Sequence, residues 1–152
     1  KYDVSRFVDP GCLAPYEGRR TISPAYDTEF SYISKDLEKL SSGLDPAKSI
    51  FLFHSPPYQS GLDRAALDNK TFDHVPLDVH VGSIAIQRFI DDFQPLLTLH
   101  GHIHESCRIT GIWKEIKGRT VSLSAATEVP ALAIVRFNAN NPGNAERQEY
   151  LL

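Results

Sequence analysis

Two short apolar runs, each ending in a histidine just before a turn, constrain the fold more than any other feature of the sequence. Residues 49–54 are SIFLFH and lead into Pro56 and Pro57, and residues 95–100 are PLLTLH and lead into Gly101. Each run has the length of a buried strand. Because both runs are apolar on both faces, they require cover on both sides of a sheet. The sequence therefore predicts a mixed domain in which helices pack on sheets.

The remaining elements are predicted from periodicity and turn residues. Apolar residues at helical spacing predict an amphipathic helix over residues 31–42, and Ser83 is a suitable N-cap for a second helix over residues 83–93. Residues 1–28 are expected to be irregular, and residues 55–82 to form a long loop. Three further strands, expected to form antiparallel pairs, are predicted over residues 107–113, 120–126 and 131–137.

Composition excludes several classes of protein. The 152 residues are 41% hydrophobic and 23% charged, as in a globular chain, and their length predicts a single domain. No apolar run approaches the roughly 18 residues of a membrane span, so we expect no membrane partner. Sixteen basic against nineteen acidic residues give a net charge of −3, which disfavours a nucleic-acid groove.

The cysteines and the N-terminal residues indicate the expected cellular setting and whether the chain is processed. Cys12 and Cys107 do not make a disulfide framework, so a reduced, cytoplasmic setting is expected. Residues 1–11 lack the apolar centre of a signal peptide. The chain begins at Lys1 and contains no methionine, which indicates a processed chain or a fragment.

The histidines gather near the ends of the predicted strands. His54 ends the first apolar run, and His102 and His104 follow the second, where Gly101 allows a sharp turn. Ligands in open α/β sheets bind outside the carboxyl ends of the strands. Because neutral imidazole is a common ligand of transition metals, these three side chains predict a metal site.

The other histidines receive different interpretations. His100 lies within the strand and is expected to pack or to support the site rather than to bind metal. His74 and His80 lie in the loop, where surface positions are usual. His80 stands close to a helix N-terminus and is the better candidate for contact with an anion.

The segments His54-Ser55-Pro56-Pro57 and Gly101-His102-Ile103-His104-Glu105-Ser106 resemble the C-terminal half of a calcineurin-like metallophosphoesterase. The stretch DVHVGS at residues 78–83 is similar to one bacterial and archaeal branch of that family, and the resemblance covers roughly residues 30–137. It implies an α+β fold, a four-layer α/β/β/α sandwich of which residues 1–152 are the C-terminal part. It also implies that residues 55–82 form an active-site loop.

The resemblance further implies a centre of two divalent metal ions, for which Mn²⁺, Fe or Zn²⁺ would suit a mixed nitrogen and oxygen shell. His54 and His102 would bind one metal and His104 the other. Glu105, Ser106 and His100 are candidates for orienting these ligands. The candidates for substrate contact are Tyr58, Arg64 and His80.

The implied activity is hydrolysis of a phosphodiester or phosphomonoester by a metal-bridged hydroxide, and a nucleotide is among the candidate small substrates. The first three metal motifs of the family are absent from this sequence. The chain is then a C-terminal piece whose N-terminal half lies elsewhere, or a natural truncation that binds one metal or none. In a third explanation the loop replaces the missing ligands with Asp63, Asp68, Asp73 or Asp78.

A different class of function also fits the sequence. A member of the same fold that lacks a complete metal centre would be a non-catalytic scaffold or a partner-binding module. Buried-type strands without full cover favour association. The expected partner is therefore a second copy of the chain or the missing N-terminal half.

Overall fold

The computed structural model describes residues 12–13, 20–21 and 32–152, which fall into two compact units divided after Gly43. In the first unit, β1 (Cys12–Leu13) pairs with β2 (Arg20–Thr21), and α1 (Ile33–Ser41) confirms the helix predicted over residues 31–42. Most of residues 1–28, expected to be irregular, lie outside the described residues.

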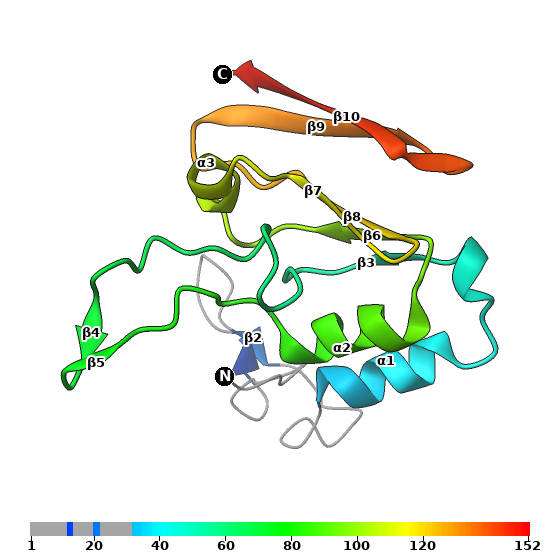
Figure 1. The fold of residues 1–152 in the computed structure, drawn as a ribbon, viewed down its shortest axis with the longest axis horizontal. Helices are drawn as coiled ribbons and strands as arrows, with labels where there is room; N and C mark the ends of the chain where they lie inside the picture. Colours follow the sequence, from blue (N-terminus) through cyan, green and yellow to red (C-terminus); the bar gives the residue numbers. More distant parts are fainter. Residues whose placement is uncertain (1–11, 14–19, 22–31) are drawn as a thin grey trace. The chain divides into compact units, whose positions relative to one another are not determined.

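A four-stranded sheet forms the centre of the second unit (Figure 1). Its order is β3-β6-β8-β7, and the strands are β3 (Ile50–Leu52), β6 (Leu97–His100), β8 (Thr120–Ser124) and β7 (Lys114–Lys117). β3 and β8 both run parallel to β6, whereas β7 is antiparallel to β8. The two apolar runs are therefore neighbours in one sheet, as predicted.

The helix α2 (Ile84–Phe93) covers one face of this sheet (Figure 1). The Ser83 hydroxyl begins the helix by accepting a hydrogen bond from the Ile86 N–H at 3.1 Å. The Phe51 ring of β3 meets the rings of Phe89 and Phe93 edge to face, at centroid distances of 4.9 and 5.9 Å. This contact confirms that the predicted helix packs on the strand.

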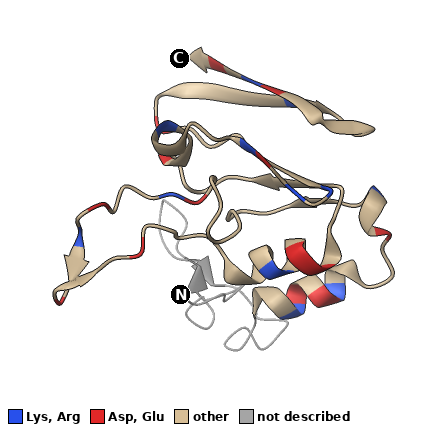
Figure 2. Cartoon of the chain, in the orientation of Figure 1, with Lys and Arg blue, Asp and Glu red and all other residues tan. Residues whose placement is uncertain are grey.

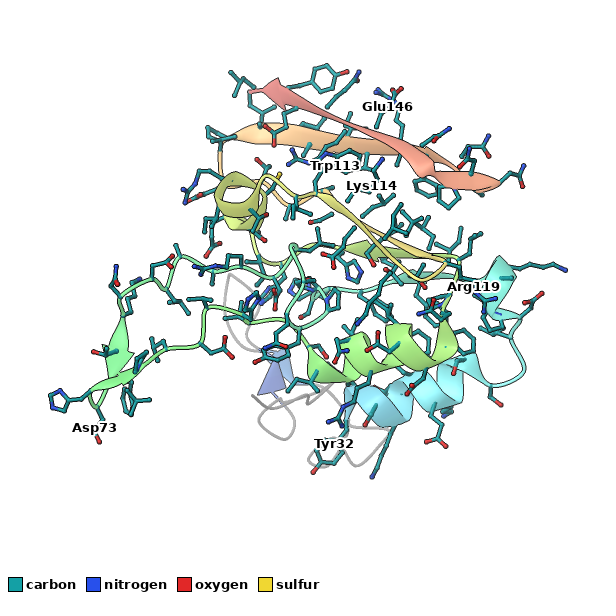
Figure 3. All side chains as sticks on the ribbon, viewed as in Figure 1. Tyr32, Asp73, Trp113, Lys114, Arg119 and Glu146 are labelled. Atoms are coloured by element: carbon teal, nitrogen blue, oxygen red, sulfur yellow. The ribbon has the colours of Figure 1, made fainter. Side chains whose placement is uncertain are left out.

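The opposite face of the sheet is covered by a long antiparallel hairpin of β9 (Ala131–Asn138) and β10 (Asn141–Leu151). Leu97, Val121 and Leu123 of the sheet and Ala145 of the hairpin form the buried core between these layers. Trp113 packs against this core (Figure 3). The second unit is thus a mixed α+β structure with helix, sheet and hairpin in three layers.

One sequence prediction fails directly after the second histidine segment. Residues 107–113 were predicted as a strand, but α3 (Ser106–Thr110) is a short helix ended by Gly111 at φ 72°. Tertiary contacts override strand propensity here, because the single Thr110 hydroxyl proton is shared between the carbonyls of Gly61 and Ser106, each 2.9 Å away. The strand comes later, as β7.

The pairing of the later strands also differs in part from the prediction. Antiparallel pairs were expected among residues 107–113, 120–126 and 131–137, but β8 pairs antiparallel with β7 and parallel with β6, and β9 pairs antiparallel with β10. The polar tail over residues 138–152, for which no strand was expected, forms β10. Its Ala145 reaches the core while Glu146, the next residue, lies on the far side of the hairpin (Figure 3).

Residues 55–82 form a long connection, as predicted, with one small hairpin of β4 (Thr71–Phe72) and β5 (Val75–Pro76). A 3₁₀ turn, η1 (Pro46–Lys48), precedes β3. Among the described helices, none has the length and apolar character needed to cross a membrane. Both basic and acidic residues occur on α2 and on the hairpin (Figure 2).

Candidate functional site

His54 and His102 lie side by side where the parallel strands β3 and β6 end. Their ring centroids are 4.4 Å apart, and both side chains are exposed. The Gly101 N–H donates to the His54 carbonyl at 3.2 Å, which ties the two turns together. His102 has a φ of 71°, a left-handed conformation uncommon for residues other than glycine. The turn therefore directs this imidazole toward His54.

The surroundings of His102 favour the neutral form of its ring, the form that binds metals. Partial burial is the largest cause that lowers the pKa of His102, and the neighbouring His54 and His104 lower it further. Glu105 acts in the opposite direction. Because only the neutral imidazole binds a metal, this environment favours ligand chemistry at His102.

The third imidazole does not complete a cluster. Within the described ranges, no group of three or more His, Cys, Asp or Glu side chains has an arrangement that could hold a metal ion. The expected metal-sized cluster of His54, His102 and His104 is therefore reduced to the first two. His104 instead lines a separate cavity beside α3 and the hairpin.

His100 supports the backbone beside the histidine pair. Its Nδ1–H donates to the Ser55 carbonyl at 3.0 Å, so its Nε2 must accept the hydrogen bond of 2.8 Å from the Thr98 hydroxyl. The Thr98 oxygen then accepts from Ser122 at 2.8 Å. This chain of hydrogen bonds holds Ser55, the residue next to His54, in place.

Burial of His100 is expected to make the protein less stable in mild acid. Burial lowers the pKa of His100 from 6.5 to about 4, so the unfolded chain binds this proton first as the pH falls. The stabilisation is complete above pH 6.5 and is lost toward pH 4, by about 2 kcal/mol between pH 7 and pH 5. Urea unfolding at both pH values should show a smaller loss for His100→Gln than for the parent chain. An equal loss in both proteins would contradict this origin.

Asp63 anchors the loop that follows His54. Its carboxylate is wholly buried, at 0% exposure, and accepts backbone N–H groups of Gln59 at 2.9 Å, Ser60 at 3.1 Å and Gly82 at 3.1 Å. The His80 Nδ1 lies 2.6 Å from the same carboxylate. Since four donors already hold Asp63, its role here is structural. This geometry gives no support to Asp63 as a replacement metal ligand.

The predicted substrate contacts differ in what their side chains bind, although Arg64 and His80 are paired by an isolated antiparallel β-bridge. The Tyr58 and His80 rings meet edge to face at 6.2 Å, and the Tyr58 hydroxyl donates to Asp78 at 2.7 Å. The Arg64 guanidinium instead forms an ion pair with Asp68 and donates to the Ala65 carbonyl at 2.8 Å. Tyr58 and His80 thus share one surface of the loop, while Arg64 binds its own segment.

Glu105 and Ser106 both hydrogen-bond the loop over residues 55–82, and Glu105 also raises the pKa of His102. The Glu105 carboxylate raises the pKa of His102 by its charge and accepts a long hydrogen bond of 3.3 Å from the Ala66 N–H. The buried Ser106 hydroxyl accepts from the Arg64 N–H at 3.1 Å and donates to the Gly61 carbonyl at 3.0 Å. Within the described residues, the hydrogen bonds of these two side chains go to backbone groups rather than to an imidazole ring.

Sequence reasoning missed two residues that shape this region. Asp63 was considered only as a metal ligand, and Arg147, which lines the cavity beside His104, was not singled out. Both are charged residues that the fold buries, and no local pattern marks Asp63. The alternation of Ala145, Glu146 and Arg147 along β10 was the available signal for Arg147.

The chain resembles an uncharacterized archaeal protein in sequence and a solved structure in fold. No family model matches the chain. It is 35% identical over 85 residues to the uncharacterized protein MJ1162 of Methanocaldococcus jannaschii, a match that covers 53% of this chain and about a third (35%) of the relative. One crystal structure resembles it with a TM-score of 0.50 at 18% identity, covering 79% of this chain and 41% of that one. At this identity the structural likeness concerns the fold alone.

Proposed function

We propose that this chain carries part of the site of a metal-dependent phosphoesterase, which hydrolyses a small phosphodiester or phosphomonoester. The observation that supports this most directly is the pair of exposed imidazoles, His54 and His102, at the ends of adjacent parallel strands. The three layers of the second unit also agree with part of a four-layer α/β/β/α sandwich, which we propose as the complete fold.

The donor set bears on the metals that this activity requires. The two imidazoles could supply part of the ligand set of a transition metal. The Glu105 carboxylate lies near enough for its charge to raise the pKa of His102. The described residues alone do not fit a two-metal centre, because no group of three or more ligands comes together. The remaining ligands would have to come from elsewhere in the natural protein. A complete centre would supply a hydroxide nucleophile and neutralise the phosphoryl charge.

The loop over residues 55–82 has features of a preorganised binding element. The Asp63 carboxylate accepts backbone N–H groups from both ends of the loop and pairs with the His80 imidazole, which fixes the ring orientation. Tyr58 adds an aromatic edge beside that ring. In the proposed function, Tyr58 contacts the organic part of the substrate and His80 contacts its phosphate.

The alternative function is a scaffold or partner-binding module of the same fold without a complete centre. The lack of a third ligand beside His54 and His102 in the described residues favours it. Its partner would be a second copy or an N-terminal half, and the expected setting is cytoplasmic. The two functions differ in whether the natural protein binds metal and turns over phosphate esters.

Metal removal from the natural gene product that contains this chain tests the proposal. Hydrolysis of bis-p-nitrophenyl phosphate and p-nitrophenyl phosphate is expected to fall to background after chelation and to return with Mn²⁺, Fe²⁺ or Zn²⁺. Bound metal is measured on the same samples by elemental analysis. A folded gene product that holds no metal and hydrolyses neither ester would favour the scaffold instead.

A further inference from the structure

A cavity whose lining includes several charged side chains lies beside His104, between α3, the segment that follows β8 and the strand β10. Its volume is about 270 Å³, and its lining includes His104, Arg108, Glu128, Arg147 and Glu149. Arg108 pairs with Glu128 at 2.6 Å, at the exposed margin of the cavity. Arg147 pairs with Glu149 at 2.6 Å and is far more buried, with only 10% of its side chain exposed.

The hydrogen bonding of Arg147 is incomplete. Its Nη2 donates to the Ala126 carbonyl at 2.9 Å and pairs with Glu149. Its Nε is buried and has no hydrogen-bond partner in the part of the chain that the structure describes. A buried donor without a protein partner is costly, and an acceptor that reaches it would relieve that cost.

The geometry of the guanidinium suggests which ligand would complete it. The planar group can present two N–H donors side by side, and a carboxylate or phosphate accepts both in a bidentate pair. Glu149 pairs with Nη2 and leaves Nε without a partner. Because the Glu149 side chain is 39% exposed, it can leave this position without opening the core.

We propose that the cavity binds a phosphate group, with Arg147 as its bidentate anchor and Glu149 as the side chain that the phosphate displaces. Arg108 supplies a second positive charge at the margin. The inference rests on the proposed function in one respect: the cavity is a substrate subsite only if His104 belongs to the centre. The binding of phosphate itself does not depend on metal.

The β9–β10 hairpin offers matched control residues for the substitutions of Arg147 and Glu149. Arg136 and Glu146 face each other across the β9–β10 ladder, one position away from the Val135–Arg147 pair. Side chains alternate between faces along a strand, and both control residues are exposed, whereas Val135 packs against the core. Glu146 lies on the far side of the hairpin in Figure 3. Arg136→Gln and Glu146→Gln therefore remove the same charges outside the cavity.

The test is a titration of the metal-free natural gene product with inorganic phosphate, and with acetate as the comparison anion. Calorimetry gives the Kd, and the Arg147 Nε–H signal in a ¹H–¹⁵N spectrum reports the new hydrogen bond. Arg147→Gln and Arg147→Lys are each expected to weaken phosphate binding about tenfold or more. Gln removes the charge, and Lys keeps the charge but lacks the planar pair of N–H donors. Glu149→Gln should tighten it several-fold, and the two control variants should change it less than twofold.

Several results would overturn the proposal. Equal weakening by Arg147→Gln and Arg136→Gln would show general charge attraction, and an unmoved Nε–H signal would place the anion elsewhere. Acetate binding as tight as phosphate would reject phosphate as the ligand. Glu149→Gln keeps the core intact, so it tests the cavity even if the Arg147 variants do not fold. Phosphate binding here without any metal-dependent hydrolysis would count against the proposed function alone.

Discussion

His54→Gln and His102→Asn are each expected to lower metal-dependent hydrolysis by the natural gene product by more than about 100-fold. The two imidazoles are the proposed ligands of one metal, and loss even of residues that merely orient ligands costs roughly 10- to 100-fold in affinity or activity. Asparagine is chosen at position 102 because it tolerates the positive φ of 71° there. Bound Mn²⁺ per chain should fall in parallel with the rate.

His74→Asn is the matched control for this experiment. His74 is also an exposed histidine with positive φ, at 63°, but it lies in the β4–β5 turn. The same change there should leave both the rate and the metal content unaltered. Full activity and full metal content in His102→Asn would refute the pair as ligands. An equal loss in the His74 variant would indicate a general effect of removing a histidine.

The sequence predicted the parts of the fold that depend on a strong local pattern. Residues 49–54 and 95–100 are apolar throughout, so both could be recognised as buried strands, and adjacent strand ends then bring His54 close to His102. The α2 helix was equally predictable, from Ser83 at its start and an apolar face that meets Phe51.

The parts that the sequence did not predict depend on contacts between distant segments. The α3 helix contains Ile109 and Thr110, which favour strands, but Thr110 is held by Gly61 in the long loop. The tail that becomes β10 is polar because its outer face meets solvent, and only Ala145 belongs to the core. Asp63 and Arg147 are buried charges. Each has a partner close in sequence, Gln59 and Glu149 respectively. Their other partners, His80 and Ala126, are distant in sequence and are brought near only by the fold.

Residues 1–152 expressed alone are expected to self-associate. β3 pairs with β6 on one side, and no described strand pairs with its other edge. This edge carries Ile50, 45% exposed, and Leu52, 82% exposed, although parallel sheets are normally covered on both faces. An open apolar edge is a template for pairing with another chain. Size-exclusion chromatography with light scattering should show dimers or larger species.

A charged edge should reverse this association. Leu52→Lys is expected to shift the isolated chain toward monomer, because a lysine on an edge strand blocks edge-to-edge pairing. Leu40→Lys, at another exposed leucine on α1, is the matched control and should leave the distribution unchanged. A parent chain that elutes as a monomer at all concentrations would refute the open edge as an association site.

The isolated chain should also lack metal-dependent turnover, whatever its oligomeric state. Among the described residues His54 and His102 come together without a third ligand, and the Asp63 carboxylate is engaged by four donors. Two neutral imidazoles cannot offset the charge of two divalent cations, so no bridging hydroxide would form. Hydrolysis of a chromogenic phosphodiester with added Mn²⁺ should stay at the background rate. Turnover by a monomeric chain would mean that acidic residues of the loop, such as Asp68, Asp73 or Asp78, supply the missing ligands after a rearrangement.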